Sequence, residues 1–352
     1  MYRVAVVGAG PSGLYAAAAL LTSDEPVSVE VLDRLPAPYG LVRYGVAPDH
    51  VKMKSVIRVL QRPFDPAELE FLADVPEPVL DALWESAVRD IHVIVRRGPQ
   101  HVKFTPAELN QIGDLANADV IVHDDGLLAA GVPEPEERRM RQCIGSLTKW
   151  TENAPTGRPR RIHLHFLRTP VRILGTDGRV SGIEIERNVV DGDRVRGTGE
   201  TTTLDVGLVV RAIGYDAQPI PGLPFDAATG TVPNEGGRVV RDGKPVPGAY
   251  VTGWIKRGPT GVIGTNKGDG IETAKAVLAD LPTLPAPAHP EPEALRAALA
   301  EHGVRAVDWT AWLRLDAEEI RRGGLRAADR VKVATTAEMI RHALDAVPTS
   351  RS

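Results

Sequence analysis

The apolar and polar residues at the start of the chain fall into blocks that predict a strand, a helix and a second strand. Residues 4–7 (VAVV) form a short apolar run, residues 14–21 (LYAAAALL) are rich in alanine and leucine, and residues 27–33 (VSVEVLD) are again β-branched. Short apolar runs that end in glycine or aspartate are typical of buried strands, whereas alanine and leucine favour helix. This order predicts a strand–helix–strand unit of the α/β class.

The middle of the chain shows two different patterns. Residues 91–95 (IHVIV) and 119–124 (DVIVHD) have the composition of buried strands and flank a helical segment at 104–113. From residue 161 to 190, polar and apolar residues alternate about a TDG turn, which predicts an antiparallel meander. Residues 206–215 (VGLVVRAIGY) then predict a buried parallel strand that returns to the first domain.

The last part of the chain is punctuated by glycine and proline. A glycine-rich turn precedes a helix that we expect to begin near Asp269, and residues 282–293 (PTLPAPAHPEPE) form a stiff, exposed linker. Two helical segments follow at 293–303 and 310–323. We expect the apolar stripe of the second segment to pack on the body of the protein.

Composition narrows the class of protein. With 352 residues, 43% of them hydrophobic and 25% charged, the chain can form two globular domains. Its net charge of -4 argues against general affinity for nucleic acid. The single cysteine, Cys143, excludes an internal disulfide, a cysteine-held iron–sulfur cluster and a dithiol pair, and we expect it to be a small buried side chain.

The same sequence predicts a cytoplasmic protein without a membrane segment. No apolar run approaches the roughly 18 residues that cross a bilayer, and the first residues enter a strand directly.

The strongest chemical signal is the turn between the first strand and the helix. Gly8, Gly10 and Gly13 have G-x-G-x-x-G spacing, and Asp33 follows Gly13 by 20 residues, at the end of the second strand. The first glycine permits a tight turn, the second admits a pyrophosphate, and the third lets the helix pack on the strand. An acid at that distance accepts a ribose hydroxyl. The segment therefore predicts a dinucleotide site.

Two further segments are suited to wrap a ligand. Residues 34–50 are rich in glycine and proline and show no helical period, so they predict an ordered loop. Farther along, Gly258, Gly261 and Gly264 would present backbone N–H groups to an anionic or carbonyl-rich ligand. A glycine-rich surface loop is the alternative interpretation of this second segment.

Three segments carry a resemblance to a known family. PYGLVRYGVAPDH (38–50), VRRGP (95–99) and GWIKRGPTGVIGTNK (253–267) resemble signatures of the adrenodoxin reductase-like ferredoxin–NADP reductases. The likeness covers residues 1 to about 60 and about 82 to 281. It implies an α/β flavoprotein with two dinucleotide-binding domains, a Rossmann-like parallel sheet and an antiparallel meander. The implied function is an oxidoreductase that passes electrons between NADPH and ferredoxin.

The resemblance also implies the domain boundaries. A truncated FAD-binding domain would comprise residues 1–81 and 206–281, and an incomplete NADP-binding domain with the meander would comprise residues 82–205. Residues 282–352 would form the proline-rich linker and a C-terminal helical segment.

Matching the motifs residue by residue assigns individual roles. The residues implied to contact FAD are Gly8, Gly10, Ser12, Gly13, Asp33, Gly40, Leu41, Trp254, Gly261, Val262 and Ile263. Those implied for NADP are Arg96, Arg97, Glu108 and again Gly261, and His50 would have a catalytic position at the flavin edge. Paired guanidinium groups at a strand end also suit phosphate on chemical grounds, although a solvated pair capping a strand is the alternative.

One expected feature is missing. A nicotinamide domain needs its own glycine-rich turn, and the sequence between Tyr44 and Arg97 contains no second strand–GxGxxG–helix. The chain is therefore an internally shortened relative, and loss of hydrogen bonds worth roughly 1.5–3 kcal/mol each should weaken NADP(H) binding. Two functions stay open: an oxidoreductase that uses FAD and NADP(H), or a non-catalytic remnant that binds FAD or no cofactor.

A basic helix face suggests the partner. Lys54, Arg58 and Arg62 recur at helical spacing with Lys52 beside them, and such a face could steer an acidic iron–sulfur protein of the ferredoxin type. A solvated helix face is the alternative.

A metal site is not predicted. His163 and His165 share one strand face, but the sequence shows no third ligand within evident reach of them.

Overall fold

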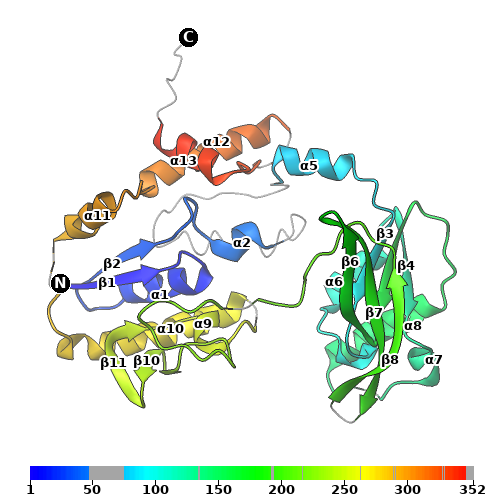
Figure 1. Ribbon diagram of the computed structural model, residues 1–352. Helices are drawn as coiled ribbons and strands as arrows, with labels where there is room; N and C mark the ends of the chain where they lie inside the picture. The colour runs from blue at the N-terminus through cyan, green and yellow to red at the C-terminus, as the bar shows by residue number, and fades with distance from the viewer. Residues whose placement is uncertain are drawn as a thin grey trace. The chain divides into compact units, whose positions relative to one another are not determined.

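The computed structural model describes residues 1–46 and 75–345, except residues 134, 192–193, 216, 262, 288, 290, 327 and 329. The chain separates into two units: unit 1 contains residues 1–84 and 214–352, and unit 2 contains residues 85–213 (Figure 1). The C-terminal residues, which the sequence set apart as a linker and a helical segment, group with unit 1. Every helix among the described residues is too short or too polar to span a bilayer.

Unit 1 begins with the predicted strand–helix–strand segment. Strands β1 (Tyr2–Val7) and β2 (Val27–Leu32) run parallel, and helix α1 (Pro11–Leu21) connects them. Helix α10 (Ile263–Asp280) lies beside α1 (Figure 1). Apolar side chains of the sheet and of both helices meet in one cluster, whose buried members are Leu20, Ala274, Val277 and Leu281.

Helix α10 begins at Ile263, earlier than Asp269, where the sequence indicated its start. Its first turns contain several glycines, which ordinarily disfavour helix. Packing explains Gly270, because a Cβ at this position would lie 2.8 Å from the backbone nitrogen of Ala16 in α1. Contact between the two helices therefore outweighs the weak local propensity.

The remaining elements of unit 1 surround this pair of helices. They are α2 (Gly40–Tyr44), α5 (Glu77–Trp84), an antiparallel sheet of β9 (Asn234–Glu235), β10 (Arg238–Arg241) and β11 (Lys244–Tyr250), α9 (Trp254–Arg257), η2 (Leu281–Thr283), α11 (Pro292–Glu301), α12 (Trp309–Gly324) and α13 (Thr336–Leu344). The two predicted C-terminal helices correspond to α11 and α12, whereas α13 was not predicted.

The apolar stripe of α12 packs on the body, as the sequence predicted. Trp312 and Leu315 are buried in a cluster with Leu14 of α1 and with Tyr39 and Val42 of the loop that follows β2. The ring centroids of Tyr39 and Trp312 lie 6.1 Å apart in an edge-on arrangement. The C-terminal helices thus hold this loop in place.

Buried charges join the same elements. Glu319 of α12 is fully buried, and its carboxylate lies 2.6 Å from Arg43 and 3.1 Å from Arg330. Its Oε1 also accepts the backbone N–H of Val333 at 3.0 Å, and Asp316 pairs with Arg330 at 2.7 Å. One carboxylate thus pairs with two buried guanidinium groups, so undocking of α12 would break both ion pairs.

The prediction for residues 206–215 is wrong. The segment forms no regular strand, and the side chains of Leu208, Val210 and Ile213 are 73%, 75% and 83% exposed. A strand needs a partner for its backbone groups, and the segment has no ladder partner among the described strands. The first sheet correspondingly contains only β1 and β2 in the described part of the chain, with Val7 81% exposed.

Unit 2 combines a parallel sheet with an antiparallel one. Strands β3 (Asp90–Ile94), β5 (Arg160–His165) and β4 (Ala118–His123) form the parallel sheet in that order. Strands β6 (Arg168–Thr176), β7 (Arg179–Asp191) and β8 (Arg194–Leu204) form the predicted meander. The alternating run from residue 161 is therefore split, because its first part, β5, belongs to the parallel sheet and not to the meander.

Helices cover one face of the parallel sheet. They are η1 (Pro99–His101), α6 (Pro106–Gly113), α7 (Leu127–Ala130) and α8 (Arg138–Thr151). Ile162 and Leu164 of β5 pack with Leu109, Leu147 and other apolar residues of these helices. Cys143 is buried in this cluster, as the sequence predicted, and burial raises the pKa of its thiol.

We predict that the Glu319→Ala substitution lowers the free energy of unfolding by about 3–5 kcal/mol. The reason is that Arg43 and Arg330 stay buried but lose the carboxylate that pairs with both of them. Denaturant titration of the variant measures this loss. The matched control is Glu318→Ala on the same helix, whose pairs with Arg321 and Arg322 are partly exposed and should contribute about 1 kcal/mol or less. Equal losses in the two variants would contradict the role of Glu319.

Candidate functional site

The glycine turn has the geometry that its spacing predicts. Gly8 has a φ of 111°, which favours glycine, and its N–H donates to the carbonyl of Leu32 at 2.6 Å. A Cβ on Gly13 would lie 2.1 Å from the carbonyl oxygen of Gly8, so α1 can approach the turn only with glycine here. A Cβ on Gly10 would meet no atom within 4 Å. The space beside Gly10, at the N-terminus of α1, suits an approaching phosphate.

Asp33 is tied to this turn. Its Oδ2 accepts the N–H of Ala9 at 2.7 Å, and its Oδ1 accepts the N–H of Leu35 at 2.9 Å. The residue is exposed, and a carboxylate has about four acceptor positions, so capacity for a ribose hydroxyl remains.

The loop after β2 lies directly against the turn. The N–H of Tyr39 donates to the carbonyl of Ala9 at 2.8 Å, and a Cβ on Gly40 would lie 3.1 Å from the Cα of Gly10. Tyr39 and Gly40 both have positive φ angles, 80° and 49°. Leu41 follows at the start of α2 and is 39% exposed. The described part of the predicted ligand loop, residues 34–46, thus packs against the glycine turn.

The segment before α9 closes on the turn from another part of the chain. Gly253 is buried, with φ 71° and ψ −143°, and a Cβ on it would lie 2.3 Å from Oγ of Ser12. Figure 1 shows α9 and the start of α10 alongside α1. Two segments separated by about 240 positions therefore meet at the predicted cofactor turn.

Two buried polar atoms flank this contact without a partner. Among the described residues, neither Oγ1 of Thr252 nor Nε1 of Trp254 has a hydrogen-bond partner. The Trp254 ring lies 5.3 Å from that of Tyr215 between centroids. An unpaired buried donor or acceptor costs roughly 1–3 kcal/mol, so a polar ligand beside Gly253 would recover that cost. Thr252 was not singled out from the sequence, where it is one threonine in the VTGW stretch.

Helix α10 braces this segment. Arg257 donates to Asp269 at 2.5 Å and to Asn266 at 2.8 Å, and Lys256 pairs with Glu272 at 2.6 Å. Gly261 follows in an exposed turn with a φ of 83°. Ile263 begins α10, so its backbone N–H belongs to the helix N-terminus.

These features fit FAD. The glycine turn and the N-terminus of α1 would hold the pyrophosphate, Asp33 would hold the adenosine ribose, and Thr252 and Trp254 offer unused polar atoms nearby. Three predicted site features lie outside the described residues: His50, Val262 and the basic face of Lys52, Lys54, Arg58 and Arg62.

The arginine pair lies where the sequence placed it. Arg96 and Arg97 follow the carboxyl end of β3 after Val95 and are exposed. The side-chain amide of Asn188, which is 2% exposed, donates to the carbonyl of Arg96 at 3.0 Å. Arg97 also lines a cavity of about 350 Å³ with Gln100, Lys103 and other residues. Asn188 thus fixes the backbone of the pair; its only sequence signal is one asparagine in an otherwise alternating strand.

Glu108 has a structural position in this fold. It is the third residue of α6 and forms a reciprocal capping box with Thr105. Its Oε2 accepts from the hydroxyl of Thr105 at 2.8 Å. A contact between Glu108 and NADP stays a prediction of the resemblance.

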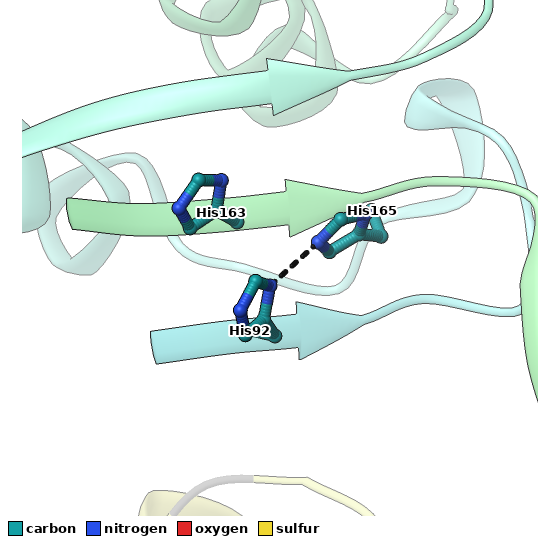
Figure 2. Close-up of side chains that lie close together, drawn as sticks. All are labelled: His92, His163 and His165. Atoms are coloured by element: carbon teal, nitrogen blue, oxygen red, sulfur yellow. Dashed lines mark hydrogen bonds between the residues drawn. The ribbon is translucent and has the colours of Figure 1, made fainter. Parts of the chain in front are cut away.

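Histidines gather on the parallel sheet of unit 2. His163 and His165 of β5 have His92 of β3 beside them, and His123 of β4 completes a group of four (Figure 2 draws the first three). A third histidine, which the sequence did not place near His163 and His165, thus comes from a neighbouring strand. Burial, followed by the charge of His123, lowers the pKa of His165 to about 3, and burial also lowers the pKa of His92 and of His123.

Comparisons with known proteins identify relatives. The family model described as the NAD(P)-binding Rossmann-like domain matches residues 6–74 of this chain. The chain is 34% identical to a probable ferredoxin/ferredoxin–NADP reductase of Mycobacterium bovis, over 97% of this chain and 76% of that protein. It is 30% identical to the mitochondrial NADPH:adrenodoxin oxidoreductase of Mus musculus, over 96% of this chain and 91% of that protein.

A solved structure is similar throughout. The structure of Mycobacterium tuberculosis FprA in complex with NADPH matches with a TM-score of 0.83 and 29% identity, over 97% of this chain and 99% of that chain. The alignment with the Mus musculus protein extends over 456 positions, whereas this chain has 352 residues. More than a hundred residues of that relative therefore have no counterpart here, in agreement with an internally shortened chain.

We predict that Gly253→Ala weakens the binding of added FAD at least about tenfold, because the strained backbone alone costs about 1–3 kcal/mol and the new Cβ collides with Ser12. Titration of protein fluorescence with FAD measures the affinity. Gly248→Ala is the matched control, since Gly248 also has a positive φ, 76°, but a Cβ there meets no atom within 4 Å. Similar FAD affinity in both variants would show that the contact does not shape the site.

Proposed function

The chain belongs to the ferredoxin–NADP reductases of the adrenodoxin reductase type, and on that premise we propose that it is an FAD-dependent oxidoreductase passing electrons between NADPH and a ferredoxin-like protein. The observation that carries the proposal is the contact of Gly253 with Ser12, which joins the Trp254 segment to the glycine turn. A flavin supplies the redox chemistry, because it takes up a hydride and releases electrons singly.

The residues of unit 1 have binding and positioning roles in this proposal. The turn from Gly8 to Gly13 binds the pyrophosphate without a side chain in the way, and Asp33 orients the ribose. The Gly253 contact and the Arg257–Asp269 pair fix Trp254 relative to the turn. Leu41, Gly261 and Ile263, together with Val262 and a catalytic His50, complete the proposed site by family likeness.

Unit 2 has the NADPH-selecting role. Arg96 and Arg97 present exposed guanidinium groups that suit the 2'-phosphate, and Asn188 and Leu167 hold the backbone of the pair through its carbonyl groups. Lys103 and Arg139 add positive charge along the cavity that Arg97 lines, although Glu136 and Glu137 also line it. These contacts support recognition of a phosphate but not of a whole dinucleotide.

One observation favours a second candidate function. The parallel sheet of unit 2 has three strands among the described residues, and the sequence before β3 contains no second glycine-rich turn. If the lost contacts amount to about 4 kcal/mol, NADPH binds about a thousandfold more weakly than in an intact domain. The alternative is a chain that binds FAD but does not turn over NADPH.

The proposed partner is an acidic iron–sulfur protein. Names of relatives refer to ferredoxin and to adrenodoxin. Lys52, Lys54, Arg58 and Arg62 form the proposed docking face, which would speed encounter through charge. A cytoplasmic location is likewise retained as a prediction from the sequence.

We predict that the purified chain binds about one FAD and that saturating NADPH bleaches the flavin under anaerobic conditions, with an NADPH affinity weakened by the missing turn. Absorption spectroscopy during NADPH titration measures both. A bound flavin that dithionite reduces but NADPH does not would support the flavin-binding alternative. A folded chain that takes up no FAD would overturn both candidates.

The arginine pair provides a separate prediction. Removal of one charge-assisted contact in Arg96→Ala or Arg97→Ala should raise the KM for NADPH by about tenfold to a hundredfold while leaving the KM for NADH unchanged. Arg179→Ala, at the exposed start of β7 in the same unit, is the control and should alter neither constant. A rise in both KM values would indicate general damage to unit 2 and not loss of 2'-phosphate recognition.

A further inference from the structure

Four imidazole rings occupy one face of the parallel sheet in unit 2. In the strand register, His92 of β3 lies opposite His163 of β5, and His123 of β4 lies opposite His165 of β5. Side chains two positions apart on a strand point to the same face, so all four rings stand together. Figure 2 shows His92 on one strand and His163 and His165 on its neighbour, with a hydrogen bond between His92 and His165.

This face differs from the other face of the same sheet. The described helices of unit 2 contribute to the apolar cluster around Ile162 and Leu164, which alternate along β5 with His163 and His165. Parallel sheets usually have helices on both faces. Here, within the described residues, the second face carries histidines and the partly exposed Asp90 where a buried apolar layer is usual.

From this arrangement we propose that His92, His163 and His165 form a binding site for one divalent transition-metal ion of the zinc class, independent of the flavin site in unit 1. The ligand nitrogens of the three residues all lie within 4.8 Å of one another, and Nδ1 of His92 is 2.9 Å from Nε2 of His165. Nitrogens that bind one zinc ion at about 2.0–2.1 Å lie about 3.4 Å apart in tetrahedral geometry. A bound ion would replace the hydrogen bond between His92 and His165.

The surroundings of His163 match those of a metal ligand. Its Nε2 lies 3.1 Å from Oδ1 of Asp90, and Arg161 holds the same carboxylate through a hydrogen bond at 2.7 Å. A histidine that donates one ring N–H to a carboxylate keeps the lone pair of its other nitrogen for a metal ion. That other nitrogen, Nδ1, forms a hydrogen bond with Nε2 of His123 at 3.0 Å, which a bound ion would replace.

The close contacts between the rings also favour an ion. His92 stacks on His163 with centroids 4.6 Å apart, and His123 stacks on His165 at 4.4 Å. Rings that stack this closely hold their nitrogens near a common point, where one ion can bind them. An ion would cross-link β3 to β5 and stabilise the sheet, of which the described helices cover one face.

The test uses the full chain, stripped of metal by a chelator and then titrated with Co²⁺ or Zn²⁺ alone. We expect about one ion per chain by equilibrium dialysis, a visible Co²⁺ spectrum of a nitrogen-ligated tetrahedral site, and a higher unfolding temperature with Zn²⁺. His92→Gln and His165→Gln should each abolish the Co²⁺ spectrum, and Asp90→Asn should weaken binding about tenfold to a hundredfold. His101→Gln, an exposed histidine of the same unit, is the matched control and should bind as the parent does.

A parent chain without a stoichiometric Co²⁺ spectrum would overturn the proposal, as would a spectrum that persists in both variants. If a variant fails to fold, the test is nuclear magnetic resonance of the histidine ring nitrogens in the parent chain, with and without Zn²⁺. Zn²⁺ should shift the ring signals of His92, His163 and His165 and leave that of His101 in place. Unchanged ring signals would rule the site out, and none of these readouts depends on flavin or on NADPH.

Discussion

The approach of Gly253 to Ser12 is the contact on which the proposed cofactor site depends. It joins the first turn of the chain to a segment about 240 positions later, and only glycine fits at Gly253, both because of its backbone angles and because of the space available. The neighbouring Gly270 extends the same close packing along α1 and α10. Because these glycines allow the backbones to approach closely, Thr252 and Trp254, with their unpaired polar atoms, lie beside the predicted phosphate turn.

The C-terminal helices support this contact indirectly, because they hold the loop that follows β2. Trp312 packs against Tyr39, and Glu319 holds Arg43, so α12 fixes the loop that runs beside Gly10. This support is important because the parallel sheet of unit 1 is small, with β1 and β2 as its described strands. The packing of Trp312 on Tyr39 and the buried ion pair of Glu319 with Arg43 thus help to stabilise this part of unit 1, as additional strands do in a larger sheet.

Unit 2 contains the arginine pair that we propose selects NADPH. The arginine pair keeps its position at the end of β3, because Asn188 and Leu167 secure its carbonyl groups from the meander side. The dinucleotide, however, also carries negative charge at the pyrophosphate, and the glycine-rich turn for that group is missing from the sequence. On the same sheet, His92, His163 and His165 form the polar face that we propose binds a metal ion.

The sequence by itself determined the local features: the turn of Gly8, Gly10 and Gly13, the acid at Asp33, the arginine pair, the meander and the apolar stripe of α12. Each depends on spacing within one segment, which periodicity and residue type record directly. Only the tertiary structure decided which segments meet. It extended α10 through its glycines, left residues 206–213 without a strand partner, and brought His92 beside His163 and His165. The physical reason is that pairing of strands and packing of helices depend on residues far apart in the chain, which no local pattern contains.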